Sequence, residues 1–185
     1  MYLYIPKKSK EIYKEIIAHR GYHDIWPENS ILAYKKALMK NMAIEVDIRK
    51  TVDNEIICIH DRYLKRLLGI KGRVSKKTYS EIKDEYILNS NEKVPTLKEV
   101  LDLINGKITI LIEVKDFMDY MYEKKLIEIM NGYNGKFYFH TKNILTYKKL
   151  QKIYETKVFW ILNPFRKRVN FIKGGHYKRA EFIVK

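Results

Sequence analysis

Four short apolar runs of this sequence end in side chains that can transfer protons or bind ions. The four endings are His19-Arg20-Gly21, Glu45-Val46-Asp47, His60-Asp61 and Glu113-Val114-Lys115. Such endings are typical of the parallel strands of a barrel, because the carboxyl ends of those strands gather at one face and build the active site there. Histidines, carboxylates and basic side chains in one place suit metal-assisted cleavage of a phosphodiester.

Glu45 and Asp47 are spaced so that one cation can bind both of them. Residues i and i+2 of a strand project from the same face, and Glu113 at the end of another strand supplies a third carboxylate. Alternating acids also occur on solvated sheet faces, but parallel strands are buried on both sides, where an unpaired charge is costly. We therefore interpret all three as metal ligands. Oxygen ligands without a thiolate favour Mg²⁺ or Ca²⁺ over Zn²⁺.

His19 and His60 are candidates for acid–base catalysis, because imidazole exchanges protons near neutral pH. Phosphodiester cleavage needs a base for the attacking oxygen and an acid for the leaving alkoxide. Arg20 and Lys115 are candidates for binding the non-bridging phosphate oxygens. His140 remains open, since it either faces this site or is a structural histidine.

The segments around these residues alternate between strand and helix patterns. Strands are expected at 16–18, 43–48, 55–60, 107–115, 137–139 and 158–162. Helices are expected at 31–38, 97–104, 120–130 and 144–154. This alternation predicts an α/β protein with parallel strands. Residues 1–14 are interpreted as a short lead-in, and residues 62–94 as an irregular segment over the barrel mouth.

The motifs occur in an order that resembles the glycerophosphodiester phosphodiesterase family, within the phosphatidylinositol-phospholipase-C-like phosphodiesterases. The resemblance covers roughly residues 16–116. Besides the four strand endings, it rests on Pro27–Ser30, Thr51–Asp53, Leu64 and Arg66 after His60-Asp61, Pro95–Leu97 and Glu99–Leu101.

The resemblance implies a TIM-type (β/α)8 barrel that hydrolyses glycerophosphodiesters to glycerol 3-phosphate and an alcohol. The implied roles are metal ligation by Glu45, Asp47 and Glu113, acid–base catalysis by His19 and His60, and phosphate binding by Arg20 and Lys115. It also implies that Glu28 and Asn29 mainly shape the loop after the first strand. Either histidine could begin as the base.

The length of the chain limits the barrel. A complete eight-fold barrel takes about 250 residues and at least about 200, whereas this sequence has 185. We therefore expect one barrel domain over residues 1–185 that is reduced or incomplete at its C-terminal end, with one more strand at 181–184. The alternative is a reduced barrel that binds anionic phosphodiesters without turnover. The complete set of candidate site residues favours the enzyme.

The chain is strongly basic, with a formal net charge of +15, and residues 141–185 hold twelve Lys and Arg against two acids. A basic surface attracts anions. The resemblance implies a glycerophosphodiester or lipid headgroup as the partner, and the basic tail at 166–179 suits contact with an anionic membrane surface. The simpler interpretation of that tail is a solvated surface, and nucleic-acid binding ranks last. A second copy of the chain could cover an open barrel edge.

The composition, with 46% hydrophobic and 32% charged residues, is typical of a globular protein. No run approaches the roughly 18 apolar residues that a membrane span needs, and no signal peptide is seen. Cys58 is the single cysteine, which excludes an internal disulfide. These features predict a cytoplasmic protein.

Overall fold

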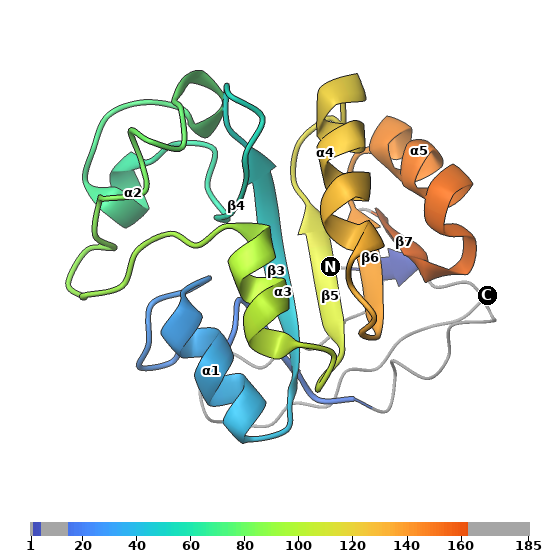
Figure 1. Ribbon diagram of the computed structural model, residues 1–185, viewed down its shortest axis with the longest axis horizontal. Coiled ribbons are helices and arrows are strands. Elements are labelled where there is room, and N and C mark those ends of the chain that lie inside the picture. The colour runs from blue at the N-terminus through green and yellow to red at the C-terminus, as the bar shows by residue number, and fades with distance from the viewer. Residues whose placement is uncertain (1, 5–14, 163–185) are drawn as a thin grey trace.

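The computed structural model describes residues 2–4 and 15–162. In this part of the chain, five parallel strands form most of the sheet. In spatial order they are β2 (Ile17–Ala18), β3 (Ala43–Lys50), β5 (Ile110–Val114), β6 (Phe137–Thr141) and β7 (Val158–Leu162). The helices α1 (Ile31–Met39), α3 (Leu97–Ile104), α4 (Tyr120–Asn131) and α5 (Ile144–Tyr154) run along one face of this sheet (Figure 1). The α/β fold with parallel strands is therefore confirmed.

The two faces of β3 differ because side chains alternate along a strand. Ile44, Val46 and Ile48 belong to the hydrophobic core formed with the helices. Glu45 and Asp47 therefore face the opposite side of the sheet, which is the inner side of a barrel. The alternation expected from the sequence is confirmed.

The register of the parallel strands places polar residues side by side. Asp47 on β3 pairs with Glu113 on β5, and Glu113 pairs in turn with His140 on β6. Residues that are paired across parallel strands point to the same face, so this register alone brings two carboxylates and an imidazole together.

The helices begin where polar side chains cap them. Ser30 accepts a hydrogen bond from the backbone N–H of Ala33 at 3.1 Å. Thr96 and Glu99 form a reciprocal capping box at the start of α3. In the described ranges we find no helix with the length and apolarity that crossing a lipid bilayer requires.

The expected strand at 55–60 differs from the prediction. It forms β4 (Ile56–Cys58), which pairs antiparallel with the end of β3 and is not one of the parallel strands. The reason is the short turn between them, in which the N–H of Thr51 donates to the carbonyl of Glu55 at 2.9 Å. A parallel connection would need a crossover of a dozen or more residues.

The interpretation of residues 1–14 as a simple lead-in is wrong at one point. Residues Tyr2–Tyr4 form strand β1, which pairs antiparallel with β7. Among the described residues, no pairing joins β1 to β2, so this part of the sheet is not closed. The predicted strand at 181–184 and the basic tail at 166–179 lie outside the described residues.

The segment 62–94 forms a lobe with its own small core. It contains the short helix α2 (Lys65–Leu68) and the 3-10 turn η2 (Val74–Lys76). Outside the lobe, another 3-10 turn, η3 (Glu155–Lys157), precedes β7. Leu64, Leu67 and Ile82 pack against Ile57 and Ile59. Figure 1 places this lobe at the end of the sheet where β3 finishes, on the side expected for a cover over the barrel mouth.

We predict that Gly21→Ala destabilises the protein by about 2 kcal/mol or more, measured by urea unfolding. Gly21 has a φ of +78°, and an added Cβ would lie 2.9 Å from the carbonyl carbon of Ala33. Gly132→Ala is the matched control, because Gly132 has a φ of −88° and a Cβ there would meet no atom within 4 Å. Equal losses of stability in the two variants would contradict the prediction.

Candidate active site

The predicted metal-binding carboxylates are buried together on the inner face of the sheet. The side chains of Glu45 and Asp47 are completely inaccessible to solvent, and Glu113 is 3% exposed. Buried carboxylates are stable only where cations or hydrogen-bond donors compensate them. The surroundings of each carboxylate therefore show what the site is built to bind.

The loop after β2 delivers Arg20 into this group. Its backbone N–H donates to Glu45 Oε2 at 3.0 Å. Its guanidinium contacts two further carboxylates, with Nε 3.1 Å from Asp47 Oδ2 and Nη1 3.1 Å from Glu28 Oε1. His19, the preceding residue, has Nε2 3.9 Å from Glu45 Oε2. One short loop therefore fixes both of its predicted site residues against β3.

Asn29 holds Asp47 directly. Its side-chain nitrogen donates to Asp47 Oδ2 at 3.1 Å, and its oxygen accepts from the Asp47 N–H at 3.1 Å and the Tyr34 hydroxyl at 2.6 Å. Asn29 has a φ of +53°, a conformation that Asn tolerates better than most residues. These hydrogen bonds show how Asn29 could shape the loop, because they fasten it to β3 and to α1.

Lys115 lies between two of the carboxylates. Its Nζ is 3.1 Å from Asp47 Oδ1 and 2.9 Å from Glu113 Oε1. The carboxylate of Asp47 therefore forms ion pairs with Lys115 and Arg20 and accepts a hydrogen bond from Asn29. None of these basic side chains forms an ion pair with Glu45 within the described ranges.

His60 reaches the site from the chain just after β4. Its Nδ1 is 2.8 Å from Asp61 Oδ1, and its backbone carbonyl accepts from Arg49 Nη2 at 2.8 Å. Asp61 also pairs with Arg66 of α2, and Arg66 Nη2 is 2.6 Å from Glu28 Oε1. Because Glu28 also contacts the guanidinium of Arg20, a continuous set of ion pairs runs from His60 to the residue that follows His19.

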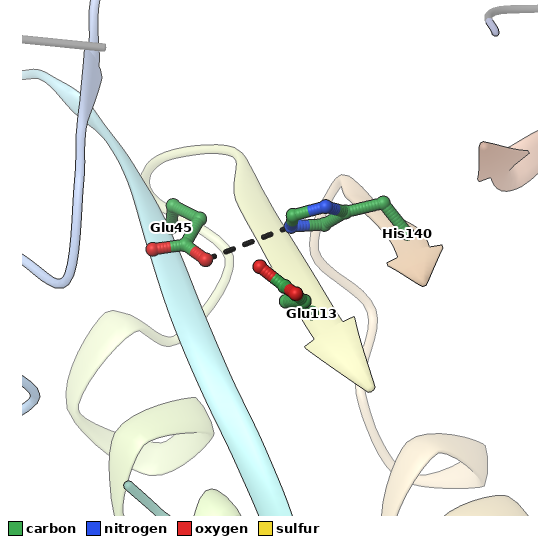
Figure 2. A group of neighbouring side chains, drawn as sticks. All are labelled: Glu45, Glu113 and His140. Atoms are coloured by element: carbon green, nitrogen blue, oxygen red, sulfur yellow. Dashed lines mark ion pairs between the residues drawn. The ribbon is translucent and has the colours of Figure 1, made fainter. Parts of the chain in front are cut away.

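His140 is the site residue that the sequence left undecided. It is completely buried on β6, with Nε2 3.6 Å from Glu45 Oε1. Figure 2 shows Glu45, Glu113 and His140 pointing toward one another from three strands. Each offers a ligand atom, and these atoms lie within 4.8 Å of one another, so this group could hold a metal ion. The signal in the sequence was the position of His140 at the carboxyl end of its strand.

The electrostatics of the three carboxylates are unequal. Burial raises the pKa of Glu45 well above its usual range, and the charges of Asp47 and Glu113 raise it further. Burial also acts on Asp47, but Lys115, His60 and Arg20 outweigh it and lower the pKa of that carboxyl to about 2. The positive charges of the site therefore compensate the charge of Asp47 but leave the carboxyl of Glu45 without a compensating cation. A divalent cation beside Glu45 would supply that positive charge, so the three residues with ligand atoms here fit a metal ion.

We predict that His19→Gln flattens the dependence of stability on pH in the metal-free protein. Burial, with a smaller effect of Arg20, lowers the pKa of His19 from 6.5 to about 4. Between these values the unfolded chain binds a proton that the folded chain does not, so the free energy of unfolding falls as the pH is lowered from 6.5 to 4.

The measurement is urea unfolding with a chelator present, at several pH values in this window. His140 contributes a slope of the same sign, because burial also lowers its pKa to about 4. The wild type should therefore lose more stability than His19→Gln as the pH falls. Identical slopes in the two proteins would contradict the assignment.

Sequence comparisons identify relatives of this chain. The model of the glycerophosphoryl diester phosphodiesterase family matches residues 19–181. A glycerophosphodiester phosphodiesterase of Caldanaerobacter subterraneus subsp. tengcongensis is 37% identical over 130 residues, which cover 64% of this chain and 53% of the relative. An uncharacterized protein of Mycoplasma genitalium is 32% identical over 171 residues, 81% of this chain and 69% of the relative. The chain spans about half the length of several curated relatives that it matches, between 44% and 54%.

Solved structures share the fold. Glycerophosphodiester phosphodiesterase from Agrobacterium tumefaciens matches with a TM-score of 0.68 at 26% identity, over 76% of this chain and 62% of that chain. The enzyme from Thermotoga maritima gives 0.67 at 26% identity, over 82% and 63%. An Oleispira antarctica phosphodiesterase gives 0.71 over 78% and 63%, and at 20% identity this likeness shows the fold alone. These neighbours are TIM-type barrels, which confirms the predicted fold class.

Proposed function

Since the chain belongs to the glycerophosphoryl diester phosphodiesterase family, we propose that it hydrolyses glycerophosphodiesters to glycerol 3-phosphate and an alcohol. The observation that carries this proposal is the convergence of the strand ends. The buried carboxylates of β3 and β5 and two basic side chains contact one another on the sheet, with His19 directly after β2 and His60 just after β4. The Oleispira antarctica phosphodiesterase holds the product sn-glycerol-3-phosphate in its structure, and the same product is proposed here.

The proposed cation ligands are Glu45, Asp47 and Glu113, with Mg²⁺ or Ca²⁺ as the ion that carboxylates favour. When bound, the cation neutralises the charge that builds on the phosphoryl group. Both oxygens of Asp47 are engaged by Lys115, Arg20 and Asn29. Ligation by Asp47 therefore requires one of these contacts to be exchanged for the ion.

Arg20 and Lys115 are proposed to bind the non-bridging phosphate oxygens. Both already lie between carboxylates, with Arg20 bridging Glu28 and Asp47 and Lys115 bridging Asp47 and Glu113. These contacts hold the two basic groups in place before substrate arrives, which lowers the cost of orienting them in the transition state.

The proposed chemistry has two steps. His19, neutral at pH 7 because burial lowers its pKa to about 4, accepts the proton of the glycerol 2-hydroxyl as that oxygen bonds to phosphorus. His60 donates a proton to the leaving alcohol as its bond to phosphorus breaks. Water then opens the cyclic phosphate, with His60 taking the proton of water and His19 returning its proton to the 2-oxygen. Asp61, 2.8 Å from Nδ1 of His60, orients the ring.

Small phosphodiesters are the proposed partners, because the two predicted phosphate ligands, Arg20 and Lys115, both contact Asp47 and so lie close together. The glycerol 3-phosphate part of a lipid headgroup would meet the same residues. The sequence has one cysteine, Cys58, which is a free thiol. The proposed location is a reducing compartment such as the cytoplasm, where proteins rarely contain disulfides.

We predict that His60→Ala lowers the rate of glycerol 3-phosphate release from glycerophosphocholine by about 10²–10⁴-fold, the usual contribution of a general acid–base group. The His60 side chain is 32% exposed, so thermal unfolding should change little. Lys98→Ala is the control, because Lys98 pairs only with Asp102 on the exposed face of α3 among the described residues. Full activity in His60→Ala would refute the acid–base role. Phosphodiester binding without turnover in the wild type would favour the alternative of a binding protein.

We also predict that Mg²⁺ or Ca²⁺ raises the thermal midpoint of the wild type but not that of Glu45→Gln. A ligand at about 100 times its dissociation constant stabilises the folded state by about 2.7 kcal/mol. Without metal, Glu45→Gln should be as stable as the wild type or more so, because a neutral amide replaces a buried carboxyl whose pKa is raised. The matched control is Glu128→Gln, whose side chain is 67% exposed, and it should keep the full shift. An equal shift in Glu45→Gln would remove Glu45 from the ligand set.

A further inference from the structure

We propose that His140 is a nitrogen ligand of the cation. The site of this chain is then a mixed carboxylate–imidazole site that prefers a first-row transition ion, such as Mn²⁺ or Fe²⁺, to Ca²⁺. The inference rests on the proposed metal site and refines its ion and its ligand set.

The first argument is the position of the imidazole. His140 lies on β6 beside Glu113 of β5 in the strand register, and its Nε2 is 3.6 Å from Glu45 Oε1. Two ligand atoms that each lie about 2.1 Å from one ion are separated by about 3–4 Å. The observed spacing falls in this range, and it is too long for a hydrogen bond between the two groups.

The second argument is the set of polar atoms left without partners. His140 and Glu45 are both completely buried. Within residues 2–4 and 15–162, neither ring nitrogen of His140 has a hydrogen-bond partner, and Glu45 Oε1 has none either. Buried polar atoms are nearly always hydrogen-bonded or bound to an ion. An ion between Nε2 and Oε1 satisfies two of these three atoms at once.

The third argument is the distribution of positive charge. Glu113 forms ion pairs with two lysines, since its Oε1 lies 2.9 Å from Lys115 Nζ and 3.8 Å from Lys142 Nζ. In the described residues Glu45 forms ion pairs only with the imidazoles of His19 and His140, at 3.9 Å and 3.6 Å. The fixed cations of the protein therefore compensate Glu113, and within the described residues no lysine or arginine side chain forms an ion pair with Glu45.

The nitrogen donor changes the expected ion. Ca²⁺ takes oxygen ligands, and Mg²⁺ retains several waters beside one or two carboxylates. Imidazole ligands shift preference toward transition ions. Removing His140 should therefore weaken the binding of Mn²⁺ more than the binding of Ca²⁺.

The test uses Mn²⁺ alone, added to the full chain after chelator treatment. Electron paramagnetic resonance measures free Mn²⁺, and pulsed experiments detect the ¹⁴N modulation of a bound imidazole. The wild type should bind Mn²⁺ with that modulation, and ¹⁵N-histidine labelling should replace it with the ¹⁵N pattern. His140→Asn should lose it and bind Mn²⁺ at least about tenfold more weakly, which is the scale expected when even an outer-shell partner is lost. Its affinity for Ca²⁺ should change by less than about threefold.

His23→Asn is the matched control, because it removes a histidine of the loop after β2 that lies outside the converging group. It should keep both the modulation and the affinity. If His140→Asn does not fold, His140→Gln and the labelled wild type carry the same test.

Two results would overturn the inference in distinguishable ways. Mn²⁺ binding without imidazole modulation, at equal affinity in the wild type and His140→Asn, would show that His140 is no ligand and would leave the proposed metal-dependent hydrolysis intact. No binding of Mn²⁺, Mg²⁺ or Ca²⁺ by the folded wild type would remove the metal site itself, and the proposed function with it.

Discussion

The burial of three carboxylates on one face of the sheet is the constraint on which the rest of this structure depends. Glu45, Asp47 and Glu113 are inaccessible or nearly so, and removing unpaired charge from water costs several kcal/mol per ion. Lys115 compensates two of these carboxylates at 2.9 Å and 3.1 Å. Glu45 has no such partner among the described residues. The protein therefore keeps an incomplete charge balance at the point where a divalent cation would act.

The same charges position the loops. Arg20 contacts Asp47 and Glu28 at 3.1 Å each, so the loop after β2 is held by the carboxylate of β3. Glu28 also contacts Arg66 of the lobe at 2.6 Å. His60 lies outside this lobe and follows β4, where the N–H of the preceding Ile59 donates to the carbonyl of Asp47 at 2.9 Å. Ion pairs thus hold the loop after β2 and the lobe together, while strand pairing with β3 places His60 near the carboxylates.

Much of the fold could be predicted from local patterns. The helix expected at 97–104 is present, and in the structure Thr96 and Glu99 form the capping box at its start. Strand β1 could not be predicted in this way, because three residues carry too little pattern and their pairing with β7 is a contact across the whole chain. The strand pattern at 55–60 contains no information on direction, and the short turn after β3 makes β4 antiparallel.

The sequence by itself determined which residues share a face and which family the motifs resemble. The period of two along a strand places Glu45 and Asp47 on one side whatever the rest of the chain does. Only the tertiary structure decided which side chains meet across strands, because each parallel neighbour returns through a helix and its register depends on how that helix packs. That register puts His140 beside Glu113. The packing of the loop after β2 and of the end of β5 brings Asn29 and Lys115 into contact with Asp47. Distances between side chains on separate strands are a property of packing, and no spacing along the chain contains them.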